Sequence, residues 1–133
     1  MEEITVRVET EINLTESEEK VKMAVANLFG NVSTEIKPSY KGSTLNAEAK
    51  EQEALVKLRN LLRSDRIRDA VRKALFGGLR GKTIRFCLNK QVAFAGHVSF
   101  SEEVAESPLG PIRVTIECEN PRQLIDWLAP RTA

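Results

Sequence analysis

The chain has 133 residues, of which 41% are hydrophobic and 29% are charged, and its formal net charge is +1. This length and composition predict one soluble globular domain over residues 1–133. No apolar run approaches the roughly 20 residues of a transmembrane helix, and the acidic start of the chain lacks the basic and apolar regions of a secretion signal. Cys87 and Cys118 are too few and too far apart for a disulfide framework. We therefore expect a cytoplasmic protein that does not bind membranes.

Alternation of apolar and polar residues over residues 3–12 predicts a first strand with one buried and one polar face. Thr15 and Glu18 form the pattern of a capping box, so we expect the first helix to begin there. Gly30 is a natural end for this helix, because glycine adopts the backbone angles of a helix C-terminus readily.

The later elements follow from the same kind of periodicity. They are strands over residues 32–37 and 44–49, two helices within 54–76 separated at Ser64-Asp65, strands over 83–88, 92–100 and 112–118, and a helix from Asn120-Pro121 to Pro130. Phe86, Phe94 and Phe100 share strand faces with aliphatic residues, so we expect all three in the core. The order βαββααβββα predicts an α+β domain, a mostly antiparallel sheet with helices packed on one face.

The small net charge conceals three unlike segments. Residues 1–53 carry six basic and eleven acidic residues, whereas residues 54–90 carry eleven basic residues and only two acidic ones. Residues 91–133 carry three basic and six acidic residues. Arginine dominates the middle segment, and its planar guanidinium group suits bidentate contacts to phosphate. The middle segment therefore predicts a surface that binds RNA.

This predicted surface centres on the helix pair and continues into the strand that follows it. Its candidate residues are the basic side chains of the segment and the polar tip of an expected hairpin: Arg59, Arg63, Arg66, Arg68, Arg72, Lys73, Arg80, Lys82, Arg85, Asn89, Lys90 and Gln91. The alternative is a solvated helix face that acidic segments of the same chain neutralise.

The glycine-rich stretch after the second helix of the pair has the elements of two named motifs. A P-loop is excluded, because Phe76 stands where that motif needs glycine and the order of strand and helix is reversed. Gly78-Leu79-Arg80-Gly81 fits the GXXG loop of KH domains, which clamps a nucleic-acid backbone between two helices. Only one flank is helical here, so the sequence favours a structural interpretation, a helix end and a turn into the next strand.

No catalytic or metal-binding constellation is recognisable in the sequence. His97 is the only histidine, and with two separated cysteines it does not make a zinc site. A nucleophile with an orienting base is also missing. We therefore expect no catalytic residue, no metal and no cofactor. A small hydrolase would require a cleft that joins His97 to acidic residues.

The C-terminal half carries strings that are specific in combination. They are Phe86-x-Leu88-Asn89-Lys90-Gln91-x-Ala93, Gly96-x-Val98-Ser99-Phe100, Pro108-Leu109-Gly110-Pro111-Ile112-x-Val114-x-Ile116 and Ile125-Asp126-Trp127-Leu128-Ala129-Pro130. With these strings the chain resembles, over nearly its whole length, a small archaeal family of uncharacterised proteins proposed to bind RNA or to associate with the exosome. The resemblance implies a fold similar to that of a large-subunit ribosomal protein, and it assigns no catalytic or binding residue.

The residues and the resemblance together predict a non-enzymatic RNA-binding or RNA-processing accessory protein. Its expected partners are RNA and a protein of an RNA-processing complex. The alternative is a protein-interaction module without a nucleic-acid role, in which the basic segment meets acidic surface on a second copy, giving a homodimer, or on another protein.

Overall fold

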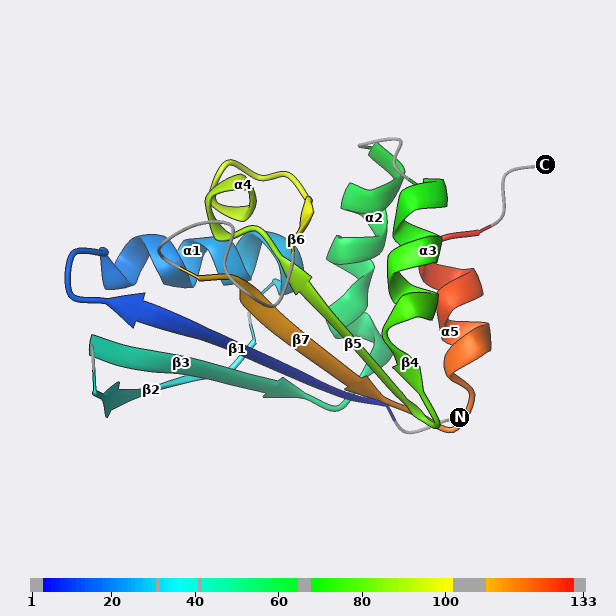
Figure 1. Ribbon diagram of the computed structural model, residues 1–133, viewed down its shortest axis with the longest axis horizontal. Helices are drawn as coiled ribbons and strands as arrows, with labels where there is room; N and C mark the ends of the chain where they lie inside the picture. Colours follow the sequence, from blue (N-terminus) through cyan, green and yellow to red (C-terminus); the bar gives the residue numbers. More distant parts are fainter. Residues whose placement is uncertain (1–3, 31, 41, 65–67, 102–109, 131–133) are drawn as a thin grey trace.

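The computed structural model describes residues 4–30, 32–40, 42–64, 68–101 and 110–130. Their strands form one sheet in the order β2-β3-β1-β7-β5-β4, and β6 pairs with β5 (Figure 1). The strands are β1 (Thr5–Asn13), β2 (Thr34–Ser39), β3 (Gly42–Ala49), β4 (Leu79–Arg80), β5 (Thr83–Leu88), β6 (Phe100–Ser101) and β7 (Ile112–Glu117). Every strand pairing in this part of the chain is antiparallel.

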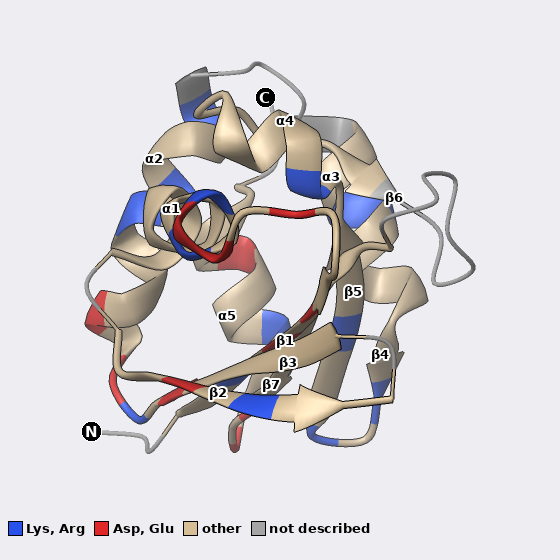
Figure 2. Ribbon diagram, turned by 90° about the vertical axis from the view of Figure 1, so that its left-hand side faces the viewer, with Lys and Arg blue, Asp and Glu red and all other residues tan. Residues whose placement is uncertain are grey.

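The helices gather over one face of the sheet, as Figures 1 and 2 show from two directions. They are α1 (Glu18–Phe29), the 3-10 helix η1 (Gln52–Leu55), α2 (Val56–Ser64), α3 (Arg68–Gly77), α4 (Lys90–Phe94) and α5 (Pro121–Leu128). The opposite face carries no helix among the described residues. The expected fold class, α+β with a mostly antiparallel sheet and helices on one face, is confirmed.

Strand β1 lies in the middle of the sheet, between β3 and β7, and shows why the sheet has two unlike faces. Val6, Val8 and Ile12 are at most 5% exposed and pack into the core beneath the helices. Arg7 and Glu9 point to the other side and are exposed. Because successive side chains of a strand point to opposite faces, the alternation of the sequence fixes this arrangement, and the predicted strand is confirmed.

Helix α1 begins two residues later than the expected capping box. Ser17 is its N-cap, and the Ser17 hydroxyl accepts a hydrogen bond from the Lys20 N–H at 3.4 Å. The Glu16 carboxylate accepts a hydrogen bond from the Asn13 N–H at 3.0 Å, so it serves the preceding turn. The capping box at Thr15 is therefore wrong in position, whereas the predicted end at Gly30, with φ of 75°, is confirmed.

The largest correction concerns the strand expected over residues 92–100. Helix α4 occupies the first part of this run, and only Phe100 belongs to a strand. The hairpin tip expected at Asn89-Lys90-Gln91 is also wrong: Asn89 caps α4, and its side-chain oxygen accepts a hydrogen bond from the Val92 N–H at 3.0 Å. Phe94 is 40% exposed, contrary to expectation, whereas Phe86 is buried as expected.

The remaining elements agree with the sequence more closely. Asn120 caps α5 by accepting a hydrogen bond from the Gln123 N–H at 3.2 Å, and Pro121 occupies the first turn. Cys118 is buried and Cys87 is partly exposed, and the two do not form a disulfide. The cap expected at Ser64-Asp65 lies outside the described side chains. No helix in the described ranges is long and apolar enough to cross a membrane.

Candidate nucleic-acid interface

The predicted RNA-binding residues are spread over five elements. Arg59 and Arg63 lie on α2, Arg72 and Lys73 on α3, Arg80 on β4, Lys82 in the β4–β5 turn, Arg85 on β5, and Asn89, Lys90 and Gln91 at the start of α4. Arg66 and the side chain of Arg68 lie outside the described part of the chain. The contacts of the ten described residues divide them into two groups. Residues of the first group bind other parts of the fold, and those of the second remain available to a ligand.

Arg59 and Arg72 both reach to the C-terminal end of α5. Arg59 Nε donates a hydrogen bond to the Trp127 carbonyl at 2.8 Å, and Arg72 Nη1 donates to the Ala129 carbonyl and to Asp126 Oδ1, each at 2.8 Å. The last carbonyls of a helix lack partners inside the helix and form the negative end of its dipole. The two arginines therefore hold α5 against α2 and α3. For these two residues the structure favours the alternative prediction, in which groups of the same chain bind the basic side chains.

Lys90 is an interior residue, so its expected place on the basic surface is wrong. Its side chain is 4% exposed, and its Nζ lies 3.0 Å from Glu16 Oε1 and 2.7 Å from the Glu11 carbonyl oxygen. Burial alone would raise the pKa of Glu16, but hydrogen bonds from Asn13 and Lys90 hold that pKa below its ordinary value. The burial of Lys90 could not be predicted from the sequence, because it depends on how the turn after β1 packs against the start of α4.

Several other basic side chains are exposed and have no carboxylate partner among the described residues. Lys73, Arg85 and Arg63 make no ion pair within the described residues. Arg80 Nη1 donates hydrogen bonds to the carbonyls of Gly77 and Leu79. The guanidinium group of Arg80 is exposed and contacts no carboxylate of the described residues. These side chains can exchange water for phosphate without breaking an ion pair.

Lys82 forms an exposed ion pair. Its Nζ lies 2.7 Å from Glu119 Oε2, and the two side chains are 66% and 68% exposed. The hydrogen bond to Glu119 and the charge of its carboxylate raise the pKa of Lys82 above its ordinary value. Because water screens an exposed pair of this kind, the contact contributes little to stability, and a phosphate can compete for the lysine.

Arg122, which follows Pro121 in the first turn of α5, adds a cation that sequence analysis did not select. Its Cζ lies 5.8 Å from the centroid of the Phe76 ring, and Arg72 Cζ lies 5.3 Å from the same centroid. Arg122 is exposed and has no ion-pair partner among the described residues. The Phe76 ring therefore brings an available arginine of α5 next to the basic end of α3.

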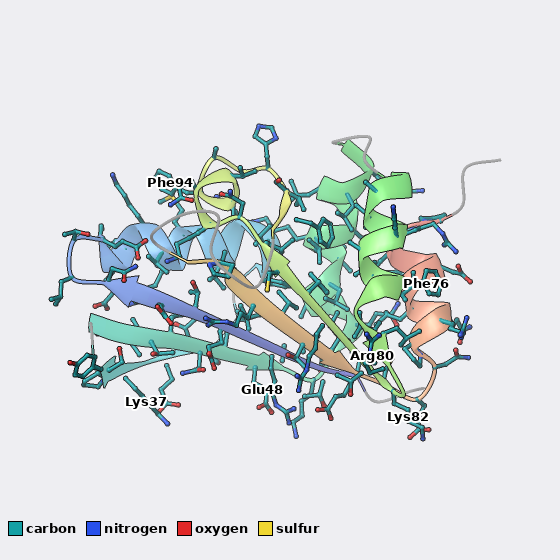
Figure 3. The ribbon with its side chains drawn as sticks, in the orientation of Figure 1. Lys37, Glu48, Phe76, Arg80, Lys82 and Phe94 are labelled. Carbon is teal, nitrogen blue, oxygen red and sulfur yellow. The ribbon has the colours of Figure 1, made fainter. Side chains whose placement is uncertain are left out.

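We give the name basic edge to five exposed cations at the β4 border of the sheet and on the adjoining helices: Lys73, Arg80, Lys82, Arg85 and Arg122. Lys73 and Arg122 lie in the helix layer, whereas Arg85 points to the open face of the sheet, because its neighbours Ile84 and Phe86 on β5 are buried. Figure 3 shows Phe76, Arg80 and Lys82 at the same end of the molecule, and Lys37 and Phe94 well away from it. Strand β4, which carries Arg80, forms the border of the sheet here. Within the described part of the chain, the ion pair of the basic edge joins Lys82 to Glu119.

The GXXG stretch of the sequence has a structural role at this border. Gly78 closes α3, and its carbonyl accepts a hydrogen bond from the Arg85 N–H at 3.0 Å. A Cβ at position 78 would collide with the carbonyl oxygen of Arg85, so the two backbones approach closely only because residue 78 is glycine. Leu79 and Arg80 form β4, and Gly81, with φ of 61°, turns the chain into β5. The structural interpretation is confirmed.

The open face of the sheet is charged (Figure 2), and the arginines on its central strands β1 and β7, unlike Arg85 on β5, are paired with glutamates among the described residues. Arg7 contacts Glu117 at 2.8 Å and Glu48 at 3.5 Å, and Arg113 contacts Glu9 at 3.3 Å. A groove on this face is lined by the same ion pairs. Acidic side chains there would repel phosphate, so this groove is a poorer site for a polyanion than the basic edge.

The described residues contain no group of three His, Cys, Asp or Glu side chains that would hold a metal ion. His97 is exposed in the segment between α4 and β6.

Comparison with known proteins places the chain in a family. Residues 5–118 match a family model described as RNA binding. A UPF0201 protein of Sulfurisphaera tokodaii is 45% identical over 126 residues, which cover 95% of this chain and 87% of the relative. The chain belongs to this RNA-binding family and to the UPF0201 proteins.

Other UPF0201 proteins match the chain along most of its length. One from Pyrobaculum islandicum is 45% identical over 123 residues, covering 92% of this chain and 86% of the relative. The crystal structure of the UPF0201 protein from Methanococcus jannaschii is 30% identical, covers 97% of this chain and 95% of that chain, and superposes with a TM-score of 0.86. The resemblance to an archaeal family is confirmed, while exosome association and a ribosomal-protein-like fold stay predictions.

Two residues of the candidate interface could not be selected from the sequence. Arg122 stands apart from the basic segment, and Phe76 reads as an ordinary core residue at the end of a helix. Only the packing of α3 against α5 brings them together. The position of Arg122 in the turn after an Asn-Pro cap was the one available signal, since it exposes the side chain at a helix start.

Proposed function

We propose that the chain binds RNA, without catalysing a reaction, through the basic edge. The observation that carries this proposal is a difference in ion pairing between two groups of cations. On the open sheet face Arg7 and Arg113 are paired with glutamates, whereas Lys73, Arg80 and Arg85 meet no carboxylate in the described residues.

The physical basis is the exchange of counterions for cationic side chains. A polyanion that binds such side chains releases condensed cations to the solution, which favours binding at low salt. Lys73 and Arg80 flank the end of α3, and Arg85 continues the positive charge onto β5. The description of the family as RNA binding supports RNA as the polyanion.

A charge-reversal variant tests the proposal. The triple variant Lys73→Glu, Arg80→Glu, Arg85→Glu is compared with Lys22→Glu, Lys37→Glu, Lys50→Glu, which changes the net charge equally at exposed lysines outside the basic edge. Fluorescence anisotropy with labelled RNA at several salt concentrations gives the affinities, and circular dichroism verifies folding.

We expect the first triple variant to lose RNA binding and the second to keep most of it. If the two variants weaken binding equally, net charge and not the basic edge determines the affinity, and the proposal is wrong. If both bind as well as the unaltered chain, the RNA contacts lie elsewhere.

A role as an accessory of an RNA-processing complex is a finer proposal that concerns another surface. Met23 on α1 is 53% exposed and Phe94 on α4 is 40% exposed. Phe94 lies far from Arg80 and Lys82 in Figure 3, so a protein bound there would leave the basic edge open to RNA. Two experiments with the double variant Met23→Ser, Phe94→Ser test this role. Light scattering shows whether the surface forms a homodimer, and copurification from archaeal cells shows whether it binds another protein. If the double variant has the same mass in solution and the same copurifying proteins as the unaltered chain, this surface does not bind a partner and the proposed role is wrong.

A further inference from the structure

Phe76 and Arg122 form a contact between elements that are distant in sequence. Phe76 lies in the last turn of α3, and Arg122 lies in the first turn of α5. The Arg122 Cζ is 5.8 Å from the ring centroid, within the range of a cation–π contact. No carboxylate in the described residues binds the Arg122 guanidinium, so its planar group remains available to a ligand.

Arg72 holds the ring from within the protein. Its Cζ lies 5.3 Å from the Phe76 centroid, and its side chain is only 13% exposed. Hydrogen bonds of 2.8 Å to Asp126 and to the Ala129 carbonyl fix the Arg72 guanidinium in place. The ring is therefore held before any ligand arrives, which lowers the entropy lost on binding.

We infer that Phe76 and Arg122 bind an unpaired RNA base, so that the basic edge prefers single-stranded RNA. This inference rests on the proposed RNA-binding function. Unpaired bases stack on aromatic rings and on arginine guanidinium planes, whereas the faces of paired bases are covered by their neighbours in the helix. A planar guanidinium held against a ring is suited to stack on a base, and an ammonium group is not.

Cations lie on either side of this pair for the phosphates next to the bound base. Lys73 is three residues before Phe76 on α3, and side chains with this spacing are neighbours on a helix surface. Arg80 Nη1 donates to the carbonyl of Gly77, the residue after Phe76. The base and its two flanking phosphates thus have separate binding groups within a few residues of one another.

The test separates stacking from charge by changing each alone. The ligands are a single-stranded oligouridylate and the same backbone with abasic sites, which has equal charge, together with a fully paired RNA duplex. The protein variants are Arg122→Lys, which keeps the charge and removes the planar group, and Phe76→Leu. Arg7→Lys is the matched control, because Arg7 is exposed, lies outside the basic edge and makes no contact with an aromatic ring in the described residues.

The unaltered chain is expected to bind the base-bearing strand about tenfold more tightly than the abasic strand, in keeping with stacking of one base. Arg122→Lys and Phe76→Leu lose this preference but keep the salt dependence of binding, because the phosphate contacts remain. Arg7→Lys keeps the preference.

Equal affinity of the unaltered chain for both strands, or an unchanged preference in both Arg122→Lys and Phe76→Leu, overturns the inference. The proposed function survives those results if the triple charge-reversal variant still loses binding. If the unaltered chain binds none of the RNAs, both proposals are wrong.

Discussion

Lys90 and Glu16 form an ion pair in the interior, although 74 residues separate them in the chain. Lys90 Nζ lies 3.0 Å from Glu16 Oε1 and 3.2 Å from Oε2, and the two side chains are 4% and 9% exposed. Glu16 also accepts hydrogen bonds from the backbone and side-chain nitrogens of Asn13. The pair therefore ties the start of α4 to the turn between β1 and α1.

Replacing Lys90 with Met is expected to lower the free energy of unfolding by about 3 kcal/mol, because the buried Glu16 carboxylate loses its cation. Urea denaturation at neutral pH measures this change. The control is Lys22→Met, which removes an exposed pair with Glu18 that is worth less than about 1 kcal/mol. Equal effects of the two substitutions would contradict the structural role of Lys90.

Glu16 also determines part of the acid sensitivity. Burial raises its pKa, but the hydrogen bonds from Asn13 and Lys90 outweigh burial and hold the pKa below its ordinary value of 4.5. Ionised Glu16 therefore stabilises the folded state above pH 4.5, and this contribution is lost as pH falls through the folded-state pKa. The difference in free energy of unfolding between the unaltered chain and Glu16→Gln should shrink over that acid range. A difference that is independent of pH in urea denaturation would rule this out.

Asn89 is expected to stabilise α4 as its N-cap. Asn89→Ala should lower the free energy of unfolding by about 1 kcal/mol, since the Val92 N–H loses its acceptor. Asn89→Asp, which keeps a side-chain oxygen at this position, should lower it by less. Thermal unfolding followed by circular dichroism compares the two variants, and an Ala variant as stable as the Asp variant would show that the cap is unimportant.

Helix α4 also shows which parts of the fold the sequence could predict. The alternation in β1 follows from burial of one face, and Val6 and Val8 are where their spacing places them. Helix α4 spans five residues, too few to establish a helical period. Asn27 Nδ2 of α1 donates hydrogen bonds to the carbonyls of Ala93 and Phe94, and these distant contacts leave no local pattern.

The same limit applies to the candidate interface. The sequence shows a basic segment, but neighbouring residues of that segment have different contacts in the structure. Arg72 is 13% exposed and bonds to α5, whereas Lys73 is exposed without an ion pair in the described residues. Successive helical residues point about 100° apart, and the place of α5 depends on tertiary packing. Composition therefore indicates an RNA-binding segment without showing which of its cations reach the surface.

Arg72 and Lys73 should accordingly respond differently to substitution. Arg72→Met should lower the free energy of unfolding by about 2 kcal/mol, because it removes charge-assisted hydrogen bonds to Asp126 and the Ala129 carbonyl. Lys73→Met should leave stability within about 0.5 kcal/mol of the unaltered chain and weaken RNA binding. Urea denaturation and anisotropy on the same preparations measure both effects. Equal loss of stability in the two variants would contradict the division between structural and binding cations.

The salt dependence of RNA binding should report the number of cations in the basic edge that contact phosphate. For single-stranded nucleic acid, each phosphate contact contributes about −0.7 to the slope of log affinity against log salt concentration. Neutralising Lys73, Arg80 and Arg85 with glutamine removes three cations, so the slope should become shallower by about 2. Neutralising Lys22, Lys37 and Lys50 with glutamine should leave the slope unchanged, because these lysines already contact glutamates outside the basic edge. Anisotropy titrations over a series of salt concentrations give both slopes, and equal slopes for the two variants would show that phosphate does not contact these three side chains.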